Sequence, residues 1–367
     1  HLSIRRQRQM CIRDRTDTPP YSLEHGGCVI NAAVNLNGQP PIHTYARIIK
    51  EPVIRITSID HSSRILIKNL EDLLDYQEPT SQFGLAKAAL VLSGFSHHTS
   101  RWPQRIKTLE QMLVLFGGGI ELTTLAAIPS GSGLGTSSIM GSVLLAVINR
   151  LRGKILSQRE LFHLVLQLEQ ELTTGGGWQD QIGGVVDGIK IITTEPGMIP
   201  DPQIRYVPAD LLDPNQNRGH SLLYYTGIRR LAKNILQYVV GNYLDRNRYA
   251  MTVLGQIHSH PPLIAETLSS KNLEKFGEMI DIAWNLNKNI DPDSSTEIIE
   301  DILTRIRPYI YGAKLLGAGG GGFLFIICRS TKEGERIRHI LEKNPPNDKA
   351  RFFDYGISKE GLVVTVC

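Results

Sequence analysis

The sequence predicts a mixed α+β protein with two domains, residues 16–200 and 201–367. Its 367 residues, 41% of them apolar and 21% charged, are enough to form two hydrophobic cores. Short segments of alternating apolar and polar residues within 42–70 predict an antiparallel sheet with one solvent-exposed face. A stretch rich in Pro, Asp and Asn at 195–220 has no period, and we place the domain boundary there.

The elements expected before the boundary alternate between strands and helices. Strands are predicted at 46–49, 53–56, 65–67 and 120–126, and helices at 83–92 and 139–151. Ser157 and Glu160 form a capping box, and leucines recur after it at helical spacing. That second helix ends in the turn at 173–177.

Beyond the boundary, helical patterns give way to strands separated by a glycine run. Helices are expected at about 227–257, 272–288, 296–311 and 332–343, and strands at 313–316, 323–328 and 362–367. No internal repeat and no low-complexity tract is present in the sequence. The elements together indicate a mixed α+β architecture.

Residues 1–15 differ in character from everything after them. They contain five of the arginines and show neither strand alternation nor helical periodicity. We therefore expect a non-native leader that resembles translated cloning or adapter sequence joined to a truncated gene. An authentic basic arm is the alternative.

Charge and cysteine usage favour small-molecule partners. Outside residues 1–15 the chain has 35 basic and 35 acidic residues, so it lacks the basic field that nucleic acid or an anionic membrane attracts. The four cysteines show neither metal-ligand spacing nor a disulfide framework, which favours a cytoplasmic location. No apolar stretch approaches the length of a membrane span or of a signal peptide.

A glycine loop, PSGSGLGTSS at 129–138, lies between the strand at 120–126 and the helix at 139–151. Glycines let a backbone approach a ligand, and the amides at a helix N-terminus attract anions, so the loop suits a polyphosphate. It is not a Walker loop, because no Gly-Lys-Ser/Thr follows, and Thr136 stands where the dinucleotide fingerprint needs glycine. A tight strand-to-helix turn is the alternative.

Two further segments carry candidate chemistry. Glu169 and Asp180 flank a glycine bend, where two carboxylates can converge as a metal ligand and a base for a hydroxyl. The alternatives are a solvated or capping aspartate and a surface glutamate, with Glu171 equally eligible as the ligand. KLLGAGGGGF at 314–323 has five glycines in six positions and implies close approach of a ligand or of the phosphate loop. A flexible hairpin is the alternative there.

These segments resemble the superfamily of galactokinase, homoserine kinase, mevalonate kinase and phosphomevalonate kinase, the GHMP kinases. PSGSGLGTSS is similar to its second signature and GAGGGGF to its third. With TDTPPYSLEHGGCVINAAV, GGGWQDQIGG and LLYYTGIRRLAKNIL, they resemble sugar 1-kinases of the fucokinase and heptose-phosphate kinase branch, the fucokinases more closely. The resemblance covers roughly residues 16–330. It implies an N-terminal ATP-binding domain like domain 2 of ribosomal protein S5 and a ferredoxin-like C-terminal domain.

The resemblance also assigns site residues. Asp180 falls on the aspartate that orients or deprotonates the anomeric hydroxyl, and Glu169 falls on the Mg²⁺-binding glutamate. Ser137 or Ser138 completes the metal site, and we choose Ser137. The residues expected to hold ATP are Pro129, Gly131, Ser132, Gly133, Leu134, Gly135, Thr136, Ser137, Ser138, Gly319 and Gly320. The residues expected to contact the sugar are Asp17, Glu24, His25 and Gly177.

The activity implied is ATP- and Mg²⁺-dependent phosphorylation of L-fucose at its anomeric hydroxyl, with a nucleotidyltransferase domain fused in the full-length protein. A heptose 7-phosphate or other sugar is the second hypothesis, for which Arg229, Arg230 and Lys233 are the candidate phosphate-binding cations. A non-catalytic nucleotide- or sugar-binding module is the third. The family's first motif is absent before Thr16; if residues 1–15 are non-native, we expect the chain to lack its first strand and a site arginine.

Overall fold

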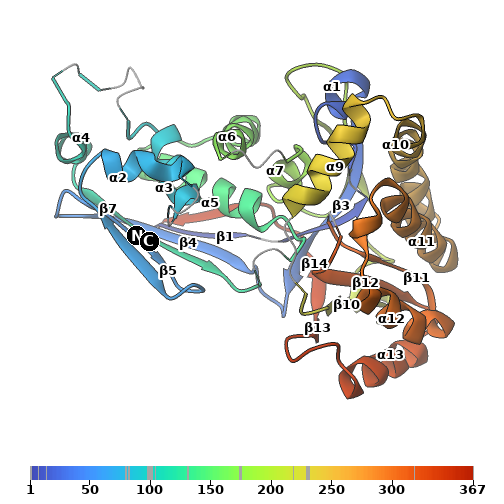
Figure 1. Cartoon of the computed structure of the whole chain (residues 1–367). Coiled ribbons are helices and arrows are strands. Elements are labelled where there is room, and N and C mark those ends of the chain that lie inside the picture. Colours follow the sequence, from blue (N-terminus) through green and yellow to red (C-terminus); the bar gives the residue numbers. More distant parts are fainter. Residues whose placement is uncertain are drawn as a thin grey trace.

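The computed structural model describes residues 2–366 with the exception of 7, 14, 79–80, 82, 97–101, 104, 130–131, 173–175, 218, 229–231 and 318. Three sheets organise the chain, and helices cover them (Figure 1). No helix in these ranges is long and apolar enough to cross a membrane.

The first sheet has six strands in the order β15-β1-β4-β7-β5-β6. Its strands are β1 Leu2–Arg6, β4 Ile42–Ile49, β5 Ile54–Ser58, β6 Ser63–Ile67, β7 Gly119–Ala126 and β15 Val363–Val366. Neighbours are antiparallel except β5 and β7. Figure 1 shows helices gathered on one face of this sheet. They include α2 Glu71–Leu74, α3 Gly84–Leu92, α4 Leu109–Phe116, α5 Thr136–Leu151 and α6 Gln158–Glu171.

The second sheet is built around the long strand β3 and lies between the first sheet and the C-terminal part (Figure 1). It contains β2 Arg8–Arg13, β3 Gly27–Leu36, β8 Ile189–Thr194, β9 Gln203–Val207 and β14 Tyr355–Ile357. The short helices α1 Tyr21–His25 and α7 Gln179–Gly183 precede β3 and β8 in the chain. This placement brings the beginnings of β3 and α7 close to one another.

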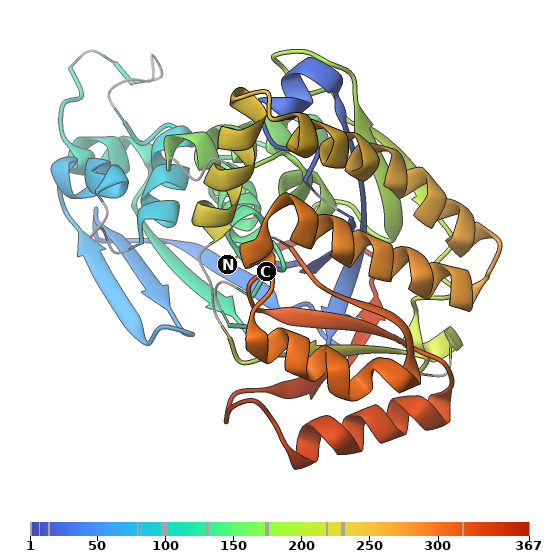
Figure 2. The same cartoon turned by 45° about the vertical axis from the view of Figure 1, so that its right-hand side comes forward.

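The third sheet has the order β11-β12-β10-β13. Its strands are β10 Ser221–Tyr225, β11 Ile310–Leu315, β12 Phe323–Cys328 and β13 Arg351–Phe353. The helices of this part are α8 Pro214–Asn217, α9 Ala232–Leu244, α10 Arg248–Ser269, α11 Leu273–Ile290, α12 Glu297–Ile306 and α13 Thr331–Lys343. The described residues also include the short 3-10 helices η1 Asp75–Gln77, η2 Pro292–Ser294 and η3 Arg307–Tyr309. In Figure 2, α10 and α11 run side by side, and the two helices are in contact.

Most of the expected elements are present within a few residues of their predicted ends. The capping box of Ser157 and Glu160 starts α6, and the strand expected at 323–328 is β12. The helical region expected at 227–257 divides into α9 and α10, and α10 continues through Pro261 and Pro262 to Ser269. The sequence pattern did not reveal α4, β8, β9, β10, β13 or β14.

The prediction that residues 1–15 lack a strand pattern is wrong. Residues 2–6 form β1 and residues 8–13 form β2, which pairs with β3. Met10, Cys11 and Ile12 are all buried, so burial does not alternate here, and the apolar run of three residues between arginines is too short to predict a strand. The segment therefore occupies a strand position in the fold, and its non-native origin stays a prediction.

The last residues of the chain return to the sheets of the N-terminal part. β14 pairs with β3, and β15 pairs with β1 at the edge of the six-stranded sheet. Residues 201–367 are therefore not one separate unit in space. The strand predicted at 362–367 corresponds to β15, but a sequence pattern does not specify its partner strand, and β14 has only three residues.

Candidate functional site

The phosphate loop predicted from the glycine pattern joins β7 to α5. Gly133 and Gly135 have φ angles of +80° and +63°, which residues with a side chain rarely adopt. Gly135 is the N-cap of α5, so no side chain caps this helix and its first amides face the loop. Gly131 lies outside the described residues. The structure thus has a helix start without a side-chain cap at this loop, and its binding of the ATP phosphates stays a prediction.

The glycine run after β11 packs directly on this loop, as expected. A Cβ built on Gly133 would lie 2.4 Å from the carbonyl oxygen of Leu316, and one on Gly322 would lie 2.4 Å from that of Ser132. The amide of Phe323 donates to the Ser132 carbonyl at 3.3 Å. Two backbones this close leave no room for side chains. The run is therefore a support for the phosphate loop and not a free hairpin.

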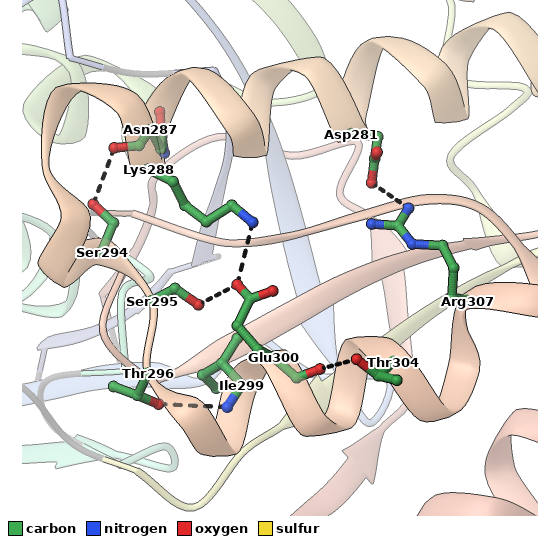
Figure 3. A network of polar contacts seen from close by, with 10 residues as sticks. All are labelled: Asp281, Asn287, Lys288, Ser294, Ser295, Thr296, Ile299, Glu300, Thr304 and Arg307. Carbon is green, nitrogen blue, oxygen red and sulfur yellow. Dashed lines mark hydrogen bonds and ion pairs between the residues drawn. The ribbon is translucent and has the colours of Figure 1, made fainter.

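Ser294 in η2 supports the glycine run from behind, a role that sequence reasoning missed. Its carbonyl accepts the amide of Gly320 at 2.5 Å, and a Cβ on Gly319 would lie 2.6 Å from the same oxygen. Its hydroxyl donates to the Asn287 carbonyl at 3.3 Å (Figure 3). Ser294 and Asn287 are fully buried, and no sequence pattern distinguishes them from loop residues.

Glu169, near the end of α6, faces the start of α5. The hydroxyl of Ser138 donates to its Oε1, and Nε2 of Gln181 donates to its Oε2 at 2.6 Å. Burial raises the pKa of Glu169 to about 7, and the charge of Asp17 adds to this, while the two hydrogen bonds act in the opposite direction. The alternative, Glu171, instead accepts from the Tyr76 hydroxyl. The structure thus distinguishes the two glutamates.

The residues around Glu169 fit a Mg²⁺ ion. Carboxylate and hydroxyl oxygens are the donors that Mg²⁺ prefers, and it commonly takes one or two carboxylates together with waters and phosphates. Within the described ranges no cluster of three or more His, Cys, Asp and Glu is present. A cation there would compensate the buried carboxylate. The hydroxyl in contact with Glu169 belongs to Ser138, whereas Ser137, our choice as ligand, is exposed.

Asp180 lies in the first turn of α7, next to the phosphate loop. A Cβ built on Gly135 would be 3.1 Å from both Cγ and Oδ1 of Asp180. The Cys11 thiol donates to Oδ1 at 3.6 Å. The N-cap of α7 is Trp178, so Asp180 is not the capping residue, and it is only partly exposed. Its carboxylate is therefore held beside the loop that would receive the phosphates.

Asp17 connects the TD segment to the same helix. Its Oδ2 accepts the amide of Gln179 at 3.1 Å, and a Cβ on Gly177 would lie 2.0 Å from that oxygen. Asp17 is almost fully buried. Four of the predicted residues are thus brought together: Asp17, Gly177, Asp180 and Gly135.

Glu24 and His25 on α1 make their contacts elsewhere. Both Glu24 oxygens accept from the Arg246 guanidinium at 2.8 Å, and Oε2 also accepts from the Tyr243 hydroxyl at 2.7 Å. These hydrogen bonds lower the pKa of Glu24 to about 2. The His25 ring lies 4.8 Å from that of Tyr21. In the part of the chain that is described, neither side chain has a polar contact with the phosphate loop or α7.

Two cavities flank this arrangement. One of about 660 Å³ has Thr136, Ser137 and Met140 of α5 on one side and Phe83 and Asp60 on the other. A larger one of about 830 Å³ is bordered by Gly176 and Trp178, by α1, by α6 and by Gln237 and Val240 of α9. The phosphate loop adjoins the first cavity, and the Gly177 turn adjoins the second.

Comparison with known protein families identifies the chain as a kinase of the GHMP class. The model of the GHMP kinases N-terminal domain matches residues 104–188, and that of the GHMP kinases C-terminal domain matches residues 264–347. The first match contains the phosphate loop, Glu169 and Asp180, and the second contains the supporting glycine run. The chain belongs to the GHMP kinase family.

Two relatives that contain a fucokinase are similar to this chain over most of its length. The chain is 41% identical over 350 residues to the L-fucokinase/L-fucose-1-P guanylyltransferase of Bacteroides fragilis, covering 95% of this chain and 37% of the relative. It is 32% identical to the bifunctional fucokinase/GDP-fucose pyrophosphorylase of Arabidopsis thaliana, covering 91% of this chain and 30% of the relative. The chain thus spans about a third of the length of these relatives.

A solved structure confirms the fold. A D-glycero-D-manno-heptose 1-phosphate kinase from Bacteroides thetaiotaomicron superposes with a TM-score of 0.73 at 15% identity, covering 100% of this chain and 99% of that chain. The predicted two-domain GHMP kinase fold is therefore correct. At this identity the likeness concerns the fold alone.

Proposed function

We propose that this chain is an ATP-dependent sugar 1-kinase that phosphorylates L-fucose at its anomeric hydroxyl, giving fucose 1-phosphate and ADP. The observation that carries the proposal is the contact of the Asp180 carboxylate with Gly135 of the phosphate loop. A base for a hydroxyl and a cradle for a triphosphate are the two parts that phosphoryl transfer needs. The similarity to two fucokinase-containing relatives supports the sugar.

In the proposed mechanism Asp180 accepts the proton of the C1 hydroxyl while the C1 oxygen attacks the γ-phosphorus. The bond from the γ-phosphorus to the bridging oxygen breaks, and ADP leaves. Amides of the loop around Gly133 and Gly135 hold the phosphates and stabilise the transferring group. Mg²⁺ bound by Glu169 with Ser137 or Ser138 would neutralise phosphate charge when present.

We assign the nucleoside to the cavity of about 660 Å³, because it begins at Thr136 and Ser137. Phe83 borders it with a φ of +64°, an unfavourable conformation for an aromatic residue. Such strain is often retained where a side chain has a role in binding. We propose that the Phe83 ring contacts the nucleotide base.

We assign the sugar to the region of Asp17, Gly177 and Asp180 and to the adjoining cavity of about 830 Å³. Its described lining contains no Lys or Arg but does contain Glu195. A phosphorylated sugar would bring a dianion next to Glu195, with no Lys or Arg in the described lining, so this lining favours a free sugar over a heptose 7-phosphate. The candidate cations Arg229 and Arg230 lie outside the described residues, and the side chain of Lys233 is not described.

The experiment that tests the proposal is ADP release with ATP and Mg²⁺ across free and phosphorylated sugars. We expect release with L-fucose and at least tenfold less with heptose 7-phosphate at equal concentration. Release with the heptose phosphate alone would favour the second hypothesis. ATP binding without release on any sugar would favour a non-catalytic module.

The full-length protein is the remaining part of the proposal. The relatives named above combine fucokinase with guanylyltransferase or pyrophosphorylase activity and are about three times as long as the matched region. We propose that the parent of this chain carries a nucleotidyltransferase domain that consumes the sugar phosphate. Detection of GDP-linked sugar after adding GTP to the full-length protein tests this.

A further inference from the structure

A cluster of charged and aromatic side chains joins α1 to the end of α9; we call it the α1–α9 clamp and define it as Tyr21, Glu24, Tyr243 and Arg246. Arg246 binds Glu24 with both terminal nitrogens at 2.8 Å, and the Tyr243 hydroxyl donates to the same carboxylate at 2.7 Å. The Arg246 guanidinium lies 5.0 Å from the centre of the Tyr243 ring, and the Tyr21 ring packs edge-on against Tyr243.

The geometry of the clamp differs from that of an ordinary surface ion pair. Exposed ion pairs contribute little on average, but a two-nitrogen contact with a shared phenol and a stacked ring fixes the orientation of every member. Arg246 also has a φ of +52°, in the turn between α9 and α10. A non-glycine residue keeps such a φ only where its surroundings hold it.

The clamp connects two walls of the larger cavity. Ser22 and Leu23, beside Glu24 on α1, line the cavity of about 830 Å³, and so do Gln237 and Val240 of α9. Val240 lies one helical turn before Tyr243, so a shift at the clamp moves the wall directly. The width of the cavity between α1 and α9 therefore depends on this contact.

We propose that Glu24 and Arg246 are positioning residues that hold α9 against α1 and so set the fit of the sugar in the larger cavity. The inference rests on the proposed function, which assigns the sugar to that cavity. It replaces the sequence-based expectation that Glu24 contacts the sugar itself. If Glu24 and Arg246 are positioning partners, substitution of either residue should have the same effect on sugar binding. If Glu24 is a sugar ligand, only its own substitution should have that effect.

The test compares Glu24→Gln, Arg246→Met and the reversed pair Glu24→Arg/Arg246→Glu. We expect each single substitution to raise the KM for L-fucose about tenfold, with kcat and the KM for ATP within about twofold, and the reversed pair to recover most of the loss. Arg336→Met is the matched control, because Arg336 also pairs with a glutamate, Glu333, and lies over a tyrosine ring, Tyr309. We expect no change in the control.

Two kinetic results would overturn the inference. One is a loss of L-fucose turnover in Glu24→Gln with Arg246→Met unaffected, which would make Glu24 a sugar ligand. The other is an unchanged KM for L-fucose in both single variants.

A second measurement needs no substrate and so separates this inference from the proposed function. Hydrogen exchange of the α9 amides at 237–244 should be at least tenfold faster in both single variants and restored in the reversed pair. Unchanged exchange would overturn the clamp. Absence of ADP release by the unmodified chain with L-fucose, together with faster exchange in the variants, would refute the assigned sugar and leave the clamp standing.

Discussion

The carboxylate of Asp180 lies against the backbone of Gly135, so close that a Cβ at position 135 would be 3.1 Å from Oδ1. The two residues are 45 positions apart in the chain. Their contact places a potential base at the start of the helix whose amides would receive phosphate. A Cβ at position 135 would require the Asp180 side chain to shift by a few tenths of an ångström, in addition to the strain of the positive φ.

Asp180→Asn should abolish turnover while leaving ATP binding largely intact. The amide keeps the shape of the side chain but accepts no proton, and general-base assistance is worth about 10²–10⁴ in rate. ADP release and calorimetric ATP titration measure the two effects. Asp187→Asn is the control, because Asp187 accepts a hydrogen bond from Tyr206 on the surface. Sugar-dependent release surviving within a few-fold in Asp180→Asn would show that Asp180 is not the base.

Gly133→Ala should weaken ATP binding beyond the effect of backbone strain. Its Cβ would meet the Leu316 carbonyl oxygen at 2.4 Å and push the two glycine loops apart. Gly38→Ala is the control, since Gly38 has a similar φ of +76° and no neighbour within 4 Å. Both should lose about 1 kcal/mol of stability from strain. Only Gly133→Ala should raise the KM for ATP, by tenfold or more, and equal behaviour of the two variants would contradict the loop contact.

The raised pKa of Glu169 predicts that the stability of the metal-free chain depends on pH. Its pKa is about 7 in the folded chain and 4.5 ordinarily, so the folded state binds the proton more tightly than the unfolded state. Glu169 therefore adds about 3 kcal/mol to the free energy of unfolding below pH 4.5, and this stabilisation is lost as the pH rises through 7. Urea unfolding in EDTA at pH 5 and pH 8 measures this fall.

The fall should be absent in Glu169→Gln and retained in Glu171→Gln, because Glu171 accepts from Tyr76 away from Ser138. Mg²⁺ should reduce the fall in the unmodified chain by stabilising the ionised carboxylate. The assignment fails if the unmodified chain and Glu169→Gln lose stability equally between pH 5 and pH 8.

Ile12→Ala tests the N-terminal segment. Ile12 is fully buried in the core beside β3, so truncation should cost about 2–5 kcal/mol of unfolding free energy. Ile155→Ala is the control at a site that is 73% exposed, and its effect should stay within about 0.5 kcal/mol. Chemical denaturation measures the free energy of unfolding of both variants. If they were equally stable, residues 8–13 would not form a strand of the sheet.

Phe83→Leu tests the nucleoside cavity. Stacking of a base on an aromatic ring is worth about 1–3 kcal/mol, so the KM for ATP should rise roughly five- to hundred-fold. The KM for L-fucose should not change, because Phe83 borders the cavity beside Thr136 and not the one beside Trp178. A larger effect on the sugar than on ATP would contradict the assignment of the two cavities.

Contiguous patterns allowed most of the fold to be predicted. The helix from Ser157 and the strand at 323–328 were found because capping boxes and apolar runs are local signals. β9 was missed because its side chains are mostly exposed and lack alternation in burial. β10 was missed for the opposite reason, since all five of its side chains are buried.

Within the candidate site, the sequence could name candidates but not select between neighbours. Residues 169 and 171 are about 200° apart around a helix with 3.6 residues per turn, so one faces α5 and the other faces Tyr76. The helical phase of α5 makes Ser138, and not Ser137, the partner of Glu169. The sequence could not indicate that Ser294 supports the glycine run, because this role depends on a backbone carbonyl, which every residue has.

Local patterns in the amino-acid sequence are enough to predict the phosphate loop, the second glycine run and the contact between them. Glycine is favoured where φ is positive or where two backbones touch, and the glycines that meet this requirement are visible in the sequence. The contact of Glu24 with Arg246 and the position of Asp180 beside Gly135 become known only from the folded chain. Such pairs join side chains from distant elements, and their distance depends on how the sheets and helices pack, which no local pattern encodes.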